Sequence, residues 1–473
     1  MLQPPLFRVL ALIAGAAVVT ACGRPSIPLR SLTQVAQSAP HAPGGIDWRT
    51  FGFSAQRWSY NPYETILTAS SVKNLKLKYA FKLGNISNAQ PILASDVKLA
   101  NGHIATAVVY AADESSNLYA VNDTAGTAIW SKALGKANSP CWSHGSNGIT
   151  SAPAIDRATN RIYVLDGGGT LSAFDLGTGN PSAGFPPVTA FRHPLLNHTW
   201  SGLLLNADGS TLYYPTASHC DSGTYFGTIN AVDTATQKIT TFQLVTQKKQ
   251  YYGNGVWSWG GEAADPDNGN LFAGVGNSLG TLGERGKYSD SVIELTPSLG
   301  FVGDEQPEND LQGDTDIGTT PVPFDDGSSK CAAFERKDGN FFSIDRTDLR
   351  NGRYVSKLAL GGNLATPAYS PANGALYVAV PNGLTKLAIG ANCALSIAWQ
   401  TPIGATGYSV PAVAKGVVYA AGGNTLYAVD ASSGAILWSS GSTIGGTITA
   451  EPTVANGRVY VTSWDKHLYV FGL

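Results

Sequence analysis

The sequence is poor in charged residues. Of its 473 residues only 14% are Asp, Glu, Lys or Arg, and 31 basic residues nearly balance 33 acidic ones, for a formal net charge of -2. Such a chain has no basic field of the kind that attracts nucleic acid. It also has a single methionine, whereas glycine occurs 54 times. Few charges and many glycines indicate strands joined by tight turns rather than helices with charged faces.

Several motifs of catalysis and metal binding are missing as well. The five cysteines include no Cys-x-x-Cys pair, which excludes a c-type haem motif and a zinc-finger framework. No Gly-x-Ser-x-Gly, His-Glu-x-x-His or phosphate-loop pattern is present, so hydrolase and nucleotide-binding functions have no support. His144, His198 and His219 lack metal-ligand spacing, and we expect them to form hydrogen bonds in loops.

The first residues resemble a bacterial lipoprotein signal. Arg8 precedes an apolar run, Val9 to Val19, which is too short to span a bilayer comfortably and has the form of a signal-peptide h-region. The run ends in Val19-Thr20-Ala21-Cys22, which resembles the lipobox. In lipoproteins this cysteine is acylated, and each buried methylene of its acyl chains adds about 0.8 kcal/mol to membrane binding. An ordinary signal peptide with a chance cysteine is the alternative.

We therefore expect three parts. Residues 1–21 are the expected signal peptide, and residues 22–46 are a flexible tether that begins at the lipidated Cys22 and is rich in proline, serine, alanine and glycine. Residues 47–473 are the expected folded domain. Gly23 stands where lipoproteins retained in the inner membrane often carry aspartate, so in a Gram-negative host we expect the anchor in the outer membrane, facing the periplasm.

A repeated pair of short apolar strands runs through this domain. The second strand of each pair begins at one of eight apolar residues: Leu118, Leu171, Ile229, Val292, Phe341, Leu384, Leu426 and Leu468. The last three intervals are 43, 42 and 42 residues, the period of a four-stranded propeller blade, and the longer earlier intervals indicate inserted loops. A further strand with a proline precedes six of the pairs, at Pro91, Pro153, Pro321, Pro367, Pro411 and Pro452. Proline lacks a ladder donor and suits the short innermost strand or its start.

The two ends of the domain complement each other. The chain stops at Leu473, after the second-to-last strand of the eighth unit, and the segment from Leu75 to Phe81 offers the missing strand. Pairing these two would close the ring and leave no open edge. We therefore predict an all-β, monomeric, eight-bladed β-propeller closed by its N- and C-terminal strands. Seven blades are the alternative if the fourth unit is not a full blade.

Four cysteines lie within the domain: Cys141, Cys220, Cys331 and Cys393. An even number in an exported chain predicts two disulfides, and four cysteines allow three pairings. We favour Cys141 with Cys220 and Cys331 with Cys393, because each of these pairs falls in neighbouring units of the repeat.

Two of the units, Leu118 to Trp130 and Leu426 to Trp438, resemble the repeat of quinoprotein (PQQ-type) propellers, in which the tryptophan of one blade docks on the next. The segment Asp47 to Gly52, followed by Ser71 to Leu75, is similar to the start of quinoprotein alcohol dehydrogenases. The resemblance implies the propeller fold and two candidate functions. One is that of dehydrogenases, which hold pyrroloquinoline quinone (PQQ) and Ca²⁺ or a lanthanide on the ring axis. The other is that of cofactor-free lipoproteins resembling the assembly factor of the outer-membrane β-barrel insertion machinery.

Residues of the fourth and fifth units resemble the dehydrogenase site. The resemblance implies these roles: Trp259 as the platform under PQQ, Lys337 as a contact to the quinone, Asn277 and Asp316 as metal ligands, and Asp314 as the catalytic base, with Asp310 in the same acidic run. The residue types suit these roles. A flat aromatic side chain stacks on a planar quinone, oxygen ligands suit a hard cation, and a carboxylate can accept an alcohol proton.

The sequence departs from the dehydrogenase pattern in two places. Cys141 is followed by Trp142 rather than by the second cysteine of a vicinal pair. The stretch Cys220 to Gly227 offers Asp221 and no glutamate where those enzymes carry a glutamate metal ligand. Losing an anionic ligand weakens a Ca²⁺ site. We therefore predict a lipid-anchored binding or scaffold protein of the bacterial envelope with protein partners there. The alternative is a PQQ- and metal-dependent alcohol or sugar oxidoreductase.

Each site-like residue also has a structural explanation. Tryptophans recur in this repeat for blade packing, Asn277 after Gly276 is typical of a turn, and the acidic run around Asp314 is typical of a solvated loop. Glu262 is an additional exception, because it occupies a position where six other units have proline. A carboxylate beside the axis, if it is not salt-bridged, predicts a polar mouth of the axial channel.

Overall fold

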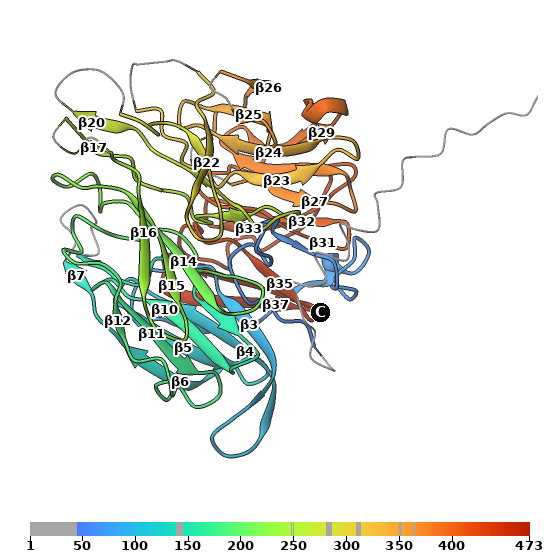
Figure 1. The fold of residues 1–473 in the computed structure, drawn as a ribbon. Helices are drawn as coiled ribbons and strands as arrows, with labels where there is room; N and C mark the ends of the chain where they lie inside the picture. The colour runs from blue at the N-terminus through green and yellow to red at the C-terminus, as the bar shows by residue number, and fades with distance from the viewer. Residues whose placement is uncertain are drawn as a thin grey trace, which may run out of the picture.

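The computed structural model describes residues 45–138, 145–246, 248, 250–280, 286–308, 314–349, 352–362, 364 and 366–473. Within them, eight sheets with four antiparallel strands each follow one another around a common axis (Figure 1). The helical segments of the described residues are two short 3-10 turns, η1 (Val72–Asn74) and η2 (Ala391–Cys393). The predicted all-β, eight-bladed propeller is therefore confirmed, and the fourth unit is a full blade.

In blades 1 to 4 the strands run from the axis to the rim in chain order. Blade 1 contains β3 (Ile92–Lys98), β4 (Ile104–Ala112), β5 (Asn117–Asn122) and β6 (Thr127–Ala133), and blade 2 contains β9 (Ala154–Asp156), β10 (Arg161–Leu165), β11 (Thr170–Asp175) and β12 (Val188–Thr189). Blade 3 contains β13 (Leu204–Leu205), β14 (Thr211–Thr216), β15 (Thr228–Asp233) and β16 (Ile239–Gln243), and blade 4 contains β18 (Ala263–Ala264), β19 (Leu271–Gly274), β21 (Val292–Leu295) and β22 (Phe301–Glu305).

Blades 5 to 7 repeat this order, and blade 8 takes its outer strand from the other end of the domain. Blade 5 contains β23 (Val322–Asp325), β24 (Lys330–Glu335), β25 (Asn340–Asp345) and β26 (Tyr354–Ala359), and blade 6 contains β27 (Ala368–Ser370), β28 (Ala375–Val380), β29 (Gly383–Ile389) and β30 (Leu395–Thr401). Blade 7 contains β31 (Ala412–Ala414), β32 (Val417–Gly422), β33 (Thr425–Asp430) and β34 (Ile436–Ser439), and blade 8 contains β35 (Thr453–Ala455), β36 (Arg458–Ser463), β37 (His467–Gly472) and β2 (Lys76–Lys82).

Burial explains the sequence pattern of each blade. The second strands, such as β28 and β32, are buried along their whole length between neighbouring blades, which requires the continuous apolar runs seen in the sequence. Outer strands such as β6 and β26 alternate between exposed and half-buried residues. Each of the six prolines stands directly before an innermost strand rather than inside it, at a position where no ladder donor is needed.

The ring closes as predicted. β2 pairs antiparallel with β37, with Phe81 opposite Leu468 and Leu77 opposite Phe471. The blue N-terminal and red C-terminal parts of the chain meet there (Figure 1). The longer intervals of the N-terminal half hold two inserted ladders, β7 (Ala137–Asn138) with β8 (Ser146–Asn147) and β17 (Tyr251–Gly253) with β20 (Ser278–Gly280).

The innermost strands are tied together by an N-terminal segment, residues 46–61, which we call the strap. It makes hydrogen bonds to all eight blades in their order around the ring. The contacts are Trp48 with Leu93, Arg49 with Ile155, Thr50 with Leu203, Ala55 with Ala264, Trp58 with Pro323 and with Tyr369, Ser59 with Val413, and Asn61 with Val454. The strap ends as β1 (Tyr60–Asn61), parallel to β31. It thus forms a second closure inside the one made by β2 and β37.

Arg57 is the charged centre of the strap. Its side chain is fully buried and donates to the carbonyl oxygens of Glu262 (3.0 Å), Phe51 (2.9 Å) and Gly202 (2.8 Å). Its charge also acts on the carboxyl groups of Glu262 in blade 4 and Glu451 in blade 8, which belong to opposite blades of the ring. Burial raises the pKa of Glu262 to about 7 and that of Glu451 to about 8, and the charge of Arg57 offsets only part of this. The prediction that Glu262 marks a channel mouth is therefore wrong, because this residue is fully buried beside the strap.

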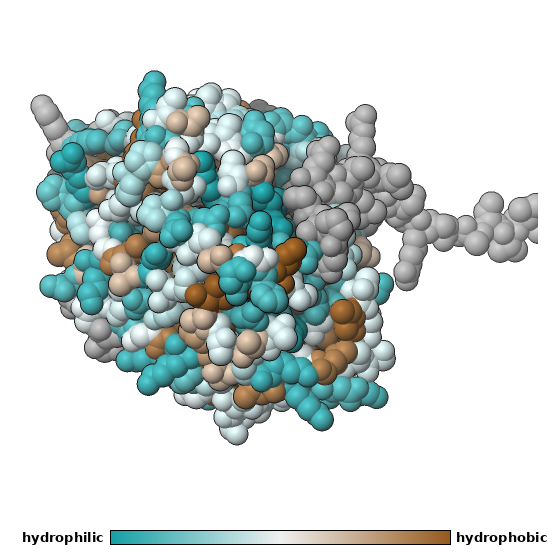
Figure 2. All heavy atoms as spheres, turned by 90° about the horizontal axis from the view of Figure 1, so that it is seen from below, coloured by the Kyte–Doolittle hydropathy of each residue, from teal (hydrophilic) through white to brown (hydrophobic). Residues whose placement is uncertain are grey.

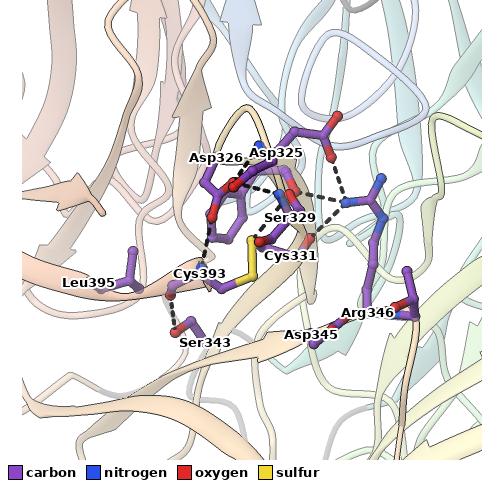
Figure 3. The surroundings of a disulfide bond; sticks show 12 residues. Asp325, Asp326, Ser329, Cys331, Ser343, Asp345, Arg346, Cys393 and Leu395 are labelled. Carbon is purple, nitrogen blue, oxygen red and sulfur yellow. Dashed lines mark hydrogen bonds and ion pairs between the residues drawn. A yellow bond between two sulfur atoms is a disulfide. The ribbon is translucent and has the colours of Figure 1, made fainter. Parts of the chain in front are cut away.

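A disulfide joins blade 5 to blade 6. Cys331 of β24 is bonded to Cys393 of η2, which confirms this predicted pairing (Figure 3). The N–H of Cys393 donates to the Asp326 carboxylate at 3.0 Å, and its carbonyl oxygen accepts from the Ser343 hydroxyl at 2.7 Å. Cys220 is also disulfide-bonded, but the predicted pairing with Cys141 cannot be followed because Cys141 lies outside the described residues.

The outer surface is mixed in character. Figure 2 shows apolar residues as small separate groups among polar ones. The most exposed large apolar side chains of the described residues, Ile104, Ile397 and Ile66, stand on separate elements. In the part of the chain that the structure describes, no helix has the length and hydrophobicity needed to span a bilayer.

Candidate functional site

The predicted site residues that the structure describes lie at one end of blades 4 and 5. Trp259 lies in the connection before β18, Asn277 between β19 and β21, Asp314 and Asp316 before β23, and Lys337 in the turn between β24 and β25. In a four-stranded antiparallel blade, the incoming connection and the turn between the second and third strands lie at the same end. The repeat therefore brings together residues that are up to 78 positions apart in the sequence. Asp310 lies outside the described residues.

Asp316 is the centre of a polar network. Its Oδ1 atom accepts the backbone N–H of Asn277 at 2.6 Å, and its own carbonyl oxygen accepts the backbone N–H of Lys337 at 2.9 Å. The Lys337 Nζ atom lies 3.5 Å from Asp316 Oδ2 and forms a closer ion pair with Asp314. Two carboxylates and one ammonium group are thus held in one cluster.

Burial decides the protonation of this cluster. It raises the pKa of Asp316 to about 7, against the hydrogen bond from Asn277 and the charge of Lys337, which lower it. The Asp314 side chain, by contrast, is 59% exposed. Burial lowers the pKa of Lys337, but the contacts with Asp314 and Asp316 outweigh this and raise it overall. The cluster therefore holds a charged lysine beside a buried aspartate whose burial opposes its ionisation.

The turn before Asn277 fits closely around Asp316. A Cβ atom on Gly276 would lie 2.4 Å from Asp316 Oδ1 and 2.9 Å from the Trp257 ring, so only glycine is accommodated there. Trp257 also packs edge-on against Tyr225, at 6.1 Å between ring centroids. The Tyr225 hydroxyl donates to Asp221 at 2.7 Å. The tryptophan beside Asp316 is thus Trp257, whereas the sequence resemblance selects Trp259.

Trp259 lies on the propeller axis. It belongs to an apolar cluster with Phe51 of the strap, Ala152 of blade 2 and Val410 of blade 7. Blades 2 and 7 are not neighbours in the ring, so residues from both blades can meet only near the axis. The Trp259 side chain is 8% exposed, and its Nε1 atom has no hydrogen-bond partner among the described residues. Trp200 connects Trp259 to the polar network, because the centroid of its ring lies 6.1 Å from the ring centroids of both Trp257 and Trp259.

The histidines next to this aromatic cluster are structural. The two ring nitrogens of His198 lie 3.0 Å from Asn147 Nδ2 and 3.1 Å from Thr150 Oγ1, and burial lowers its pKa well below the ordinary value. The His219 ring is stacked on Trp200 at 5.6 Å. The predicted hydrogen-bonding role is confirmed for His198, while His144 lies outside the described residues.

Sequence reasoning assigned no role to Trp200 and Tyr225, or to Arg57 and Glu451 of the axis. Arg57 had a signal in the sequence, because it is the one charged residue in the aromatic-rich stretch from Phe51 to Tyr60. Trp200 and Tyr225 had none, since their roles depend on loops of blade 3 reaching blade 4.

A large cavity lies elsewhere in the described part of the chain. It measures about 860 Å³ and is lined by strap residues such as Arg49 and Gln56 and by the turns between the first and second strands of blades 2, 3 and 4. These turns lie at the opposite end of the blades from the candidate site, and no predicted site residue lines the cavity. We therefore base the site on the converging side chains and not on this cavity.

The residues present fit a metal poorly. Ca²⁺ takes six to eight oxygen ligands, as a rule including several carboxylates. Here Asp221 is bonded to Tyr225, and both Asp314 and Asp316 are bonded to Lys337. The donor set for the metal is therefore already engaged within the protein, and the Trp259 ring is buried in an apolar cluster.

A family model described as outer membrane protein assembly factor BamB matches residues 67–239 and 343–472, well over half of the chain. The chain belongs to this BamB-type family of PQQ-like propellers. The match omits residues 240–342, which contain all five described site residues. No curated protein matches the sequence.

Solved structures agree with the BamB-type fold. The quinohemoprotein alcohol dehydrogenase from Comamonas testosteroni has a TM-score of 0.68 at 16% identity, over 93% of this chain and 82% of that one. A europium-containing methanol dehydrogenase has a TM-score of 0.64 at 14% identity, over 91% of this chain and 98% of that one. BamB from Moraxella catarrhalis has a TM-score of 0.54 at 16% identity, over 84% and 99%. At these identities the similarity shows the fold alone.

Proposed function

We propose that the chain is a lipid-anchored binding or scaffold protein of the bacterial envelope that uses no cofactor. The observation that carries the proposal is that the carboxylates of the candidate site are engaged by groups of the protein itself, Asp221 by the Tyr225 hydroxyl and Asp314 and Asp316 by Lys337. Membership in the BamB-type family supports the scaffold class.

The proposed interaction face is formed by the inserted loops of blades 3 to 5. The β17–β20 ladder projects from this region at the upper left of Figure 1. A photo-crosslinking amino acid at Leu279, in β20, should give an adduct with another envelope protein in intact cells. The same group at Ile104, which is 65% exposed on blade 1, serves as the matched control. An adduct from Ile104 alone would place the interface on another side of the ring.

The lipid anchor is proposed from the lipobox alone. A Cys22→Ser variant should move from the membrane fraction to the soluble periplasmic fraction, because acylation supplies the anchor. Retention of the variant in the membrane fraction would refute acylation at this residue.

A cofactor titration tests the cofactor-free part of the proposal. Purified domain is mixed with PQQ and Ca²⁺ or a lanthanide, while quinone absorbance, the melting temperature and dye-linked alcohol oxidation are followed. We expect no stoichiometric binding and no activity. Stoichiometric binding that is lost in a Trp259→Ala, Asn277→Ala variant but kept in Trp464→Ala, a tryptophan of blade 8, would overturn the proposal.

The second candidate is a PQQ- and metal-dependent alcohol or sugar oxidoreductase. It is favoured by one specific observation, that Asn277, Asp314, Asp316 and Lys337 lie together in one polar cluster, as the resemblance to the dehydrogenases implies. In this candidate, Asp314 as base, Trp259 and Lys337 as quinone contacts and Asn277 and Asp316 as metal ligands remain predictions.

A further inference from the structure

We propose that Lys337 supplies the positive charge that a metal ion would otherwise bring to the Asp314–Asp316 site, and that its ammonium group excludes a cation from this site. The inference rests on the proposed cofactor-free function. It concerns a single side chain, so one substitution should convert the site into a cation site.

The position of the ammonium group is fixed by the backbone. The N–H of Lys337 donates to the carbonyl oxygen of Asp316 at 2.9 Å, so the turn that carries the lysine is attached to the residue that its side chain faces. The side chain then reaches both Asp314 and Asp316. The neighbouring Arg336 directs its guanidinium group elsewhere, to Glu308 at 2.9 Å and to Asp338. The turn therefore places Lys337, and not Arg336, beside these two carboxylates.

The surroundings of Asp316 are otherwise suited to a cation. Its side chain is 7% exposed, and the closely fitting Gly276–Asn277 turn holds one of its oxygens. The carboxylates that contact Lys337 are therefore the buried Asp316 and the exposed Asp314, while the buried Asp290 accepts hydrogen bonds from Ser289 and Thr315. Hard cations select oxygen ligands, and affinity grows with the count of charged ligands.

A bound cation and the ammonium group exclude each other. A divalent or trivalent ion at the two carboxylates would lie within a few ångströms of Lys337 Nζ, and like charges at that distance repel strongly in a partly buried site. The ion would also have to replace both ion pairs of the lysine. Removing the ammonium group while keeping the length of the side chain, as in Lys337→Met, removes the repulsion and leaves the carboxylates in place.

Terbium luminescence gives a direct test that needs neither quinone nor activity. Trp257 packs against Gly276 beside Asp316 and is placed to sensitise emission from Tb³⁺ bound there. The folded full-length domain is titrated with Tb³⁺ as wild type, Lys337→Met, Lys337→Arg and Lys337→Met with Asp316→Asn. Lys330→Met is the matched control, because Lys330 forms an ion pair with Asp267 at 2.8 Å away from the site. Thermal unfolding checks that each variant is folded.

We expect Lys337→Met to bind Tb³⁺ at least about tenfold more tightly than wild type, with the gain lost on adding Asp316→Asn. Lys337→Arg and Lys330→Met should behave like wild type. Equal, Asp316-dependent binding by wild type and Lys337→Met would overturn the inference, and so would a folded Lys337→Met without any gain. Neither result bears on the cofactor-free function, which is overturned only if PQQ binds in the cofactor titration. The two proposals are therefore tested by different measurements.

Discussion

Neighbouring blades are held together in two different ways. In the regular C-terminal half, an outer-strand tryptophan docks on the following blade, as Trp438 does on blade 8, where its Nε1 donates to the Leu75 carbonyl at 3.0 Å. Trp399 packs likewise against the Gly434 turn of blade 7. Between blades 4 and 5, a buried arginine takes over this role. The molecule thus uses charge at the junction beside its least regular unit, and the three aspartates of this junction, Asp265, Asp267 and Asp325, lie in the region that the family model leaves unmatched.

Arg346 makes this charged junction. Its guanidinium group is fully buried and reaches three carboxylates, Asp265 at 2.9 Å, Asp267 at 2.8 Å and Asp325 at 2.7 Å. Burying a charge is costly unless its partners are complete, so such a junction is strong when intact and fragile when one member is lost. A docked tryptophan depends instead on apolar area and one hydrogen bond.

The largest expected effect is that of breaking the charged junction. Arg346→Met should lower the free energy of unfolding by about 3–5 kcal/mol, because it leaves the buried Asp265 carboxylate without its cation and removes two further ion pairs, with the partly exposed Asp267 and Asp325. Urea unfolding followed by tryptophan fluorescence measures the loss. The difference from wild type should shrink at low pH, because the contacts with Lys330 and Arg346 outweigh burial and lower the pKa of Asp267, so that this part of the junction is lost as the pH falls through that pKa. A pH-independent loss would mean that the junction depends on packing rather than on charge.

The Cys331–Cys393 disulfide covalently joins the two regions at the boundary between blades 5 and 6. The Cys331→Ser, Cys393→Ser variant should be less stable by about 2–4 kcal/mol, because the bond closes a long loop between cysteines that are 62 positions apart in the sequence. Differential scanning calorimetry should also show whether blades 1–5 and 6–8 then unfold in separate steps. A single transition at the wild-type temperature would show that the disulfide adds nothing to the coupling of the two regions.

Glu262 of blade 4 and Glu451 of blade 8, the buried carboxyl groups next to the strap, should both make the stability of the protein depend on pH in the same direction. The folded-state pKa values of Glu262 and Glu451, about 7 and 8, lie above the ordinary 4.5. Their contribution is therefore complete below about pH 4.5 and is lost as the pH rises through 7 to 8. Each of Glu262→Gln and Glu451→Gln should flatten this decline by on the order of 2 kcal/mol between pH 5 and pH 9.

Unfolding curves at several pH values compare the two variants, and Asp208→Asn is the control because Asp208 is exposed. An unchanged slope in one variant would show that its carboxyl group ionises in the folded protein as it does in the unfolded chain, which would contradict the raised pKa.

The smallest effect is expected at the docked tryptophan. Trp438→Phe keeps an aromatic ring but loses the hydrogen bond to Leu75, which should cost about 1 kcal/mol. Trp130→Phe is the matched variant at the junction of blades 1 and 2, where Nε1 donates to Leu176 at 2.9 Å. Neither loss should change with salt concentration. A strong salt dependence would remove the distinction between the two kinds of junction.

The fold could be predicted from the sequence because the repeat records contacts within a blade. The residues that begin the third strands, such as Leu118 and Leu468, fall within one position of the observed strand starts, and Leu75 to Phe81 pairs with β37 as predicted. Pairing partners within a blade are close in the sequence, and the one distant pairing was identified because a strand was missing.

The candidate site was predictable only in part. Asn277, Asp314, Asp316 and Lys337 come together because the repeat places them at the same end of blades 4 and 5. Their bonds to one another were not predictable, since they depend on how a turn of blade 5 meets the connection before it. The same holds for Trp257, which lies beside Asp316 because a loop of blade 4 folds over the Gly276 turn.

The strap has a consequence for how this propeller can change over time. Duplication or loss of one repeat is a simple genetic event, and a ring closed only by β2 and β37 could accept it. The strap, however, meets the eight innermost strands one after another within the stretch from Trp48 to Asn61. A ninth blade would have no contact left to receive, and a ring of seven would leave buried donors and acceptors without partners. A segment outside the repeat thus limits the number of repeats.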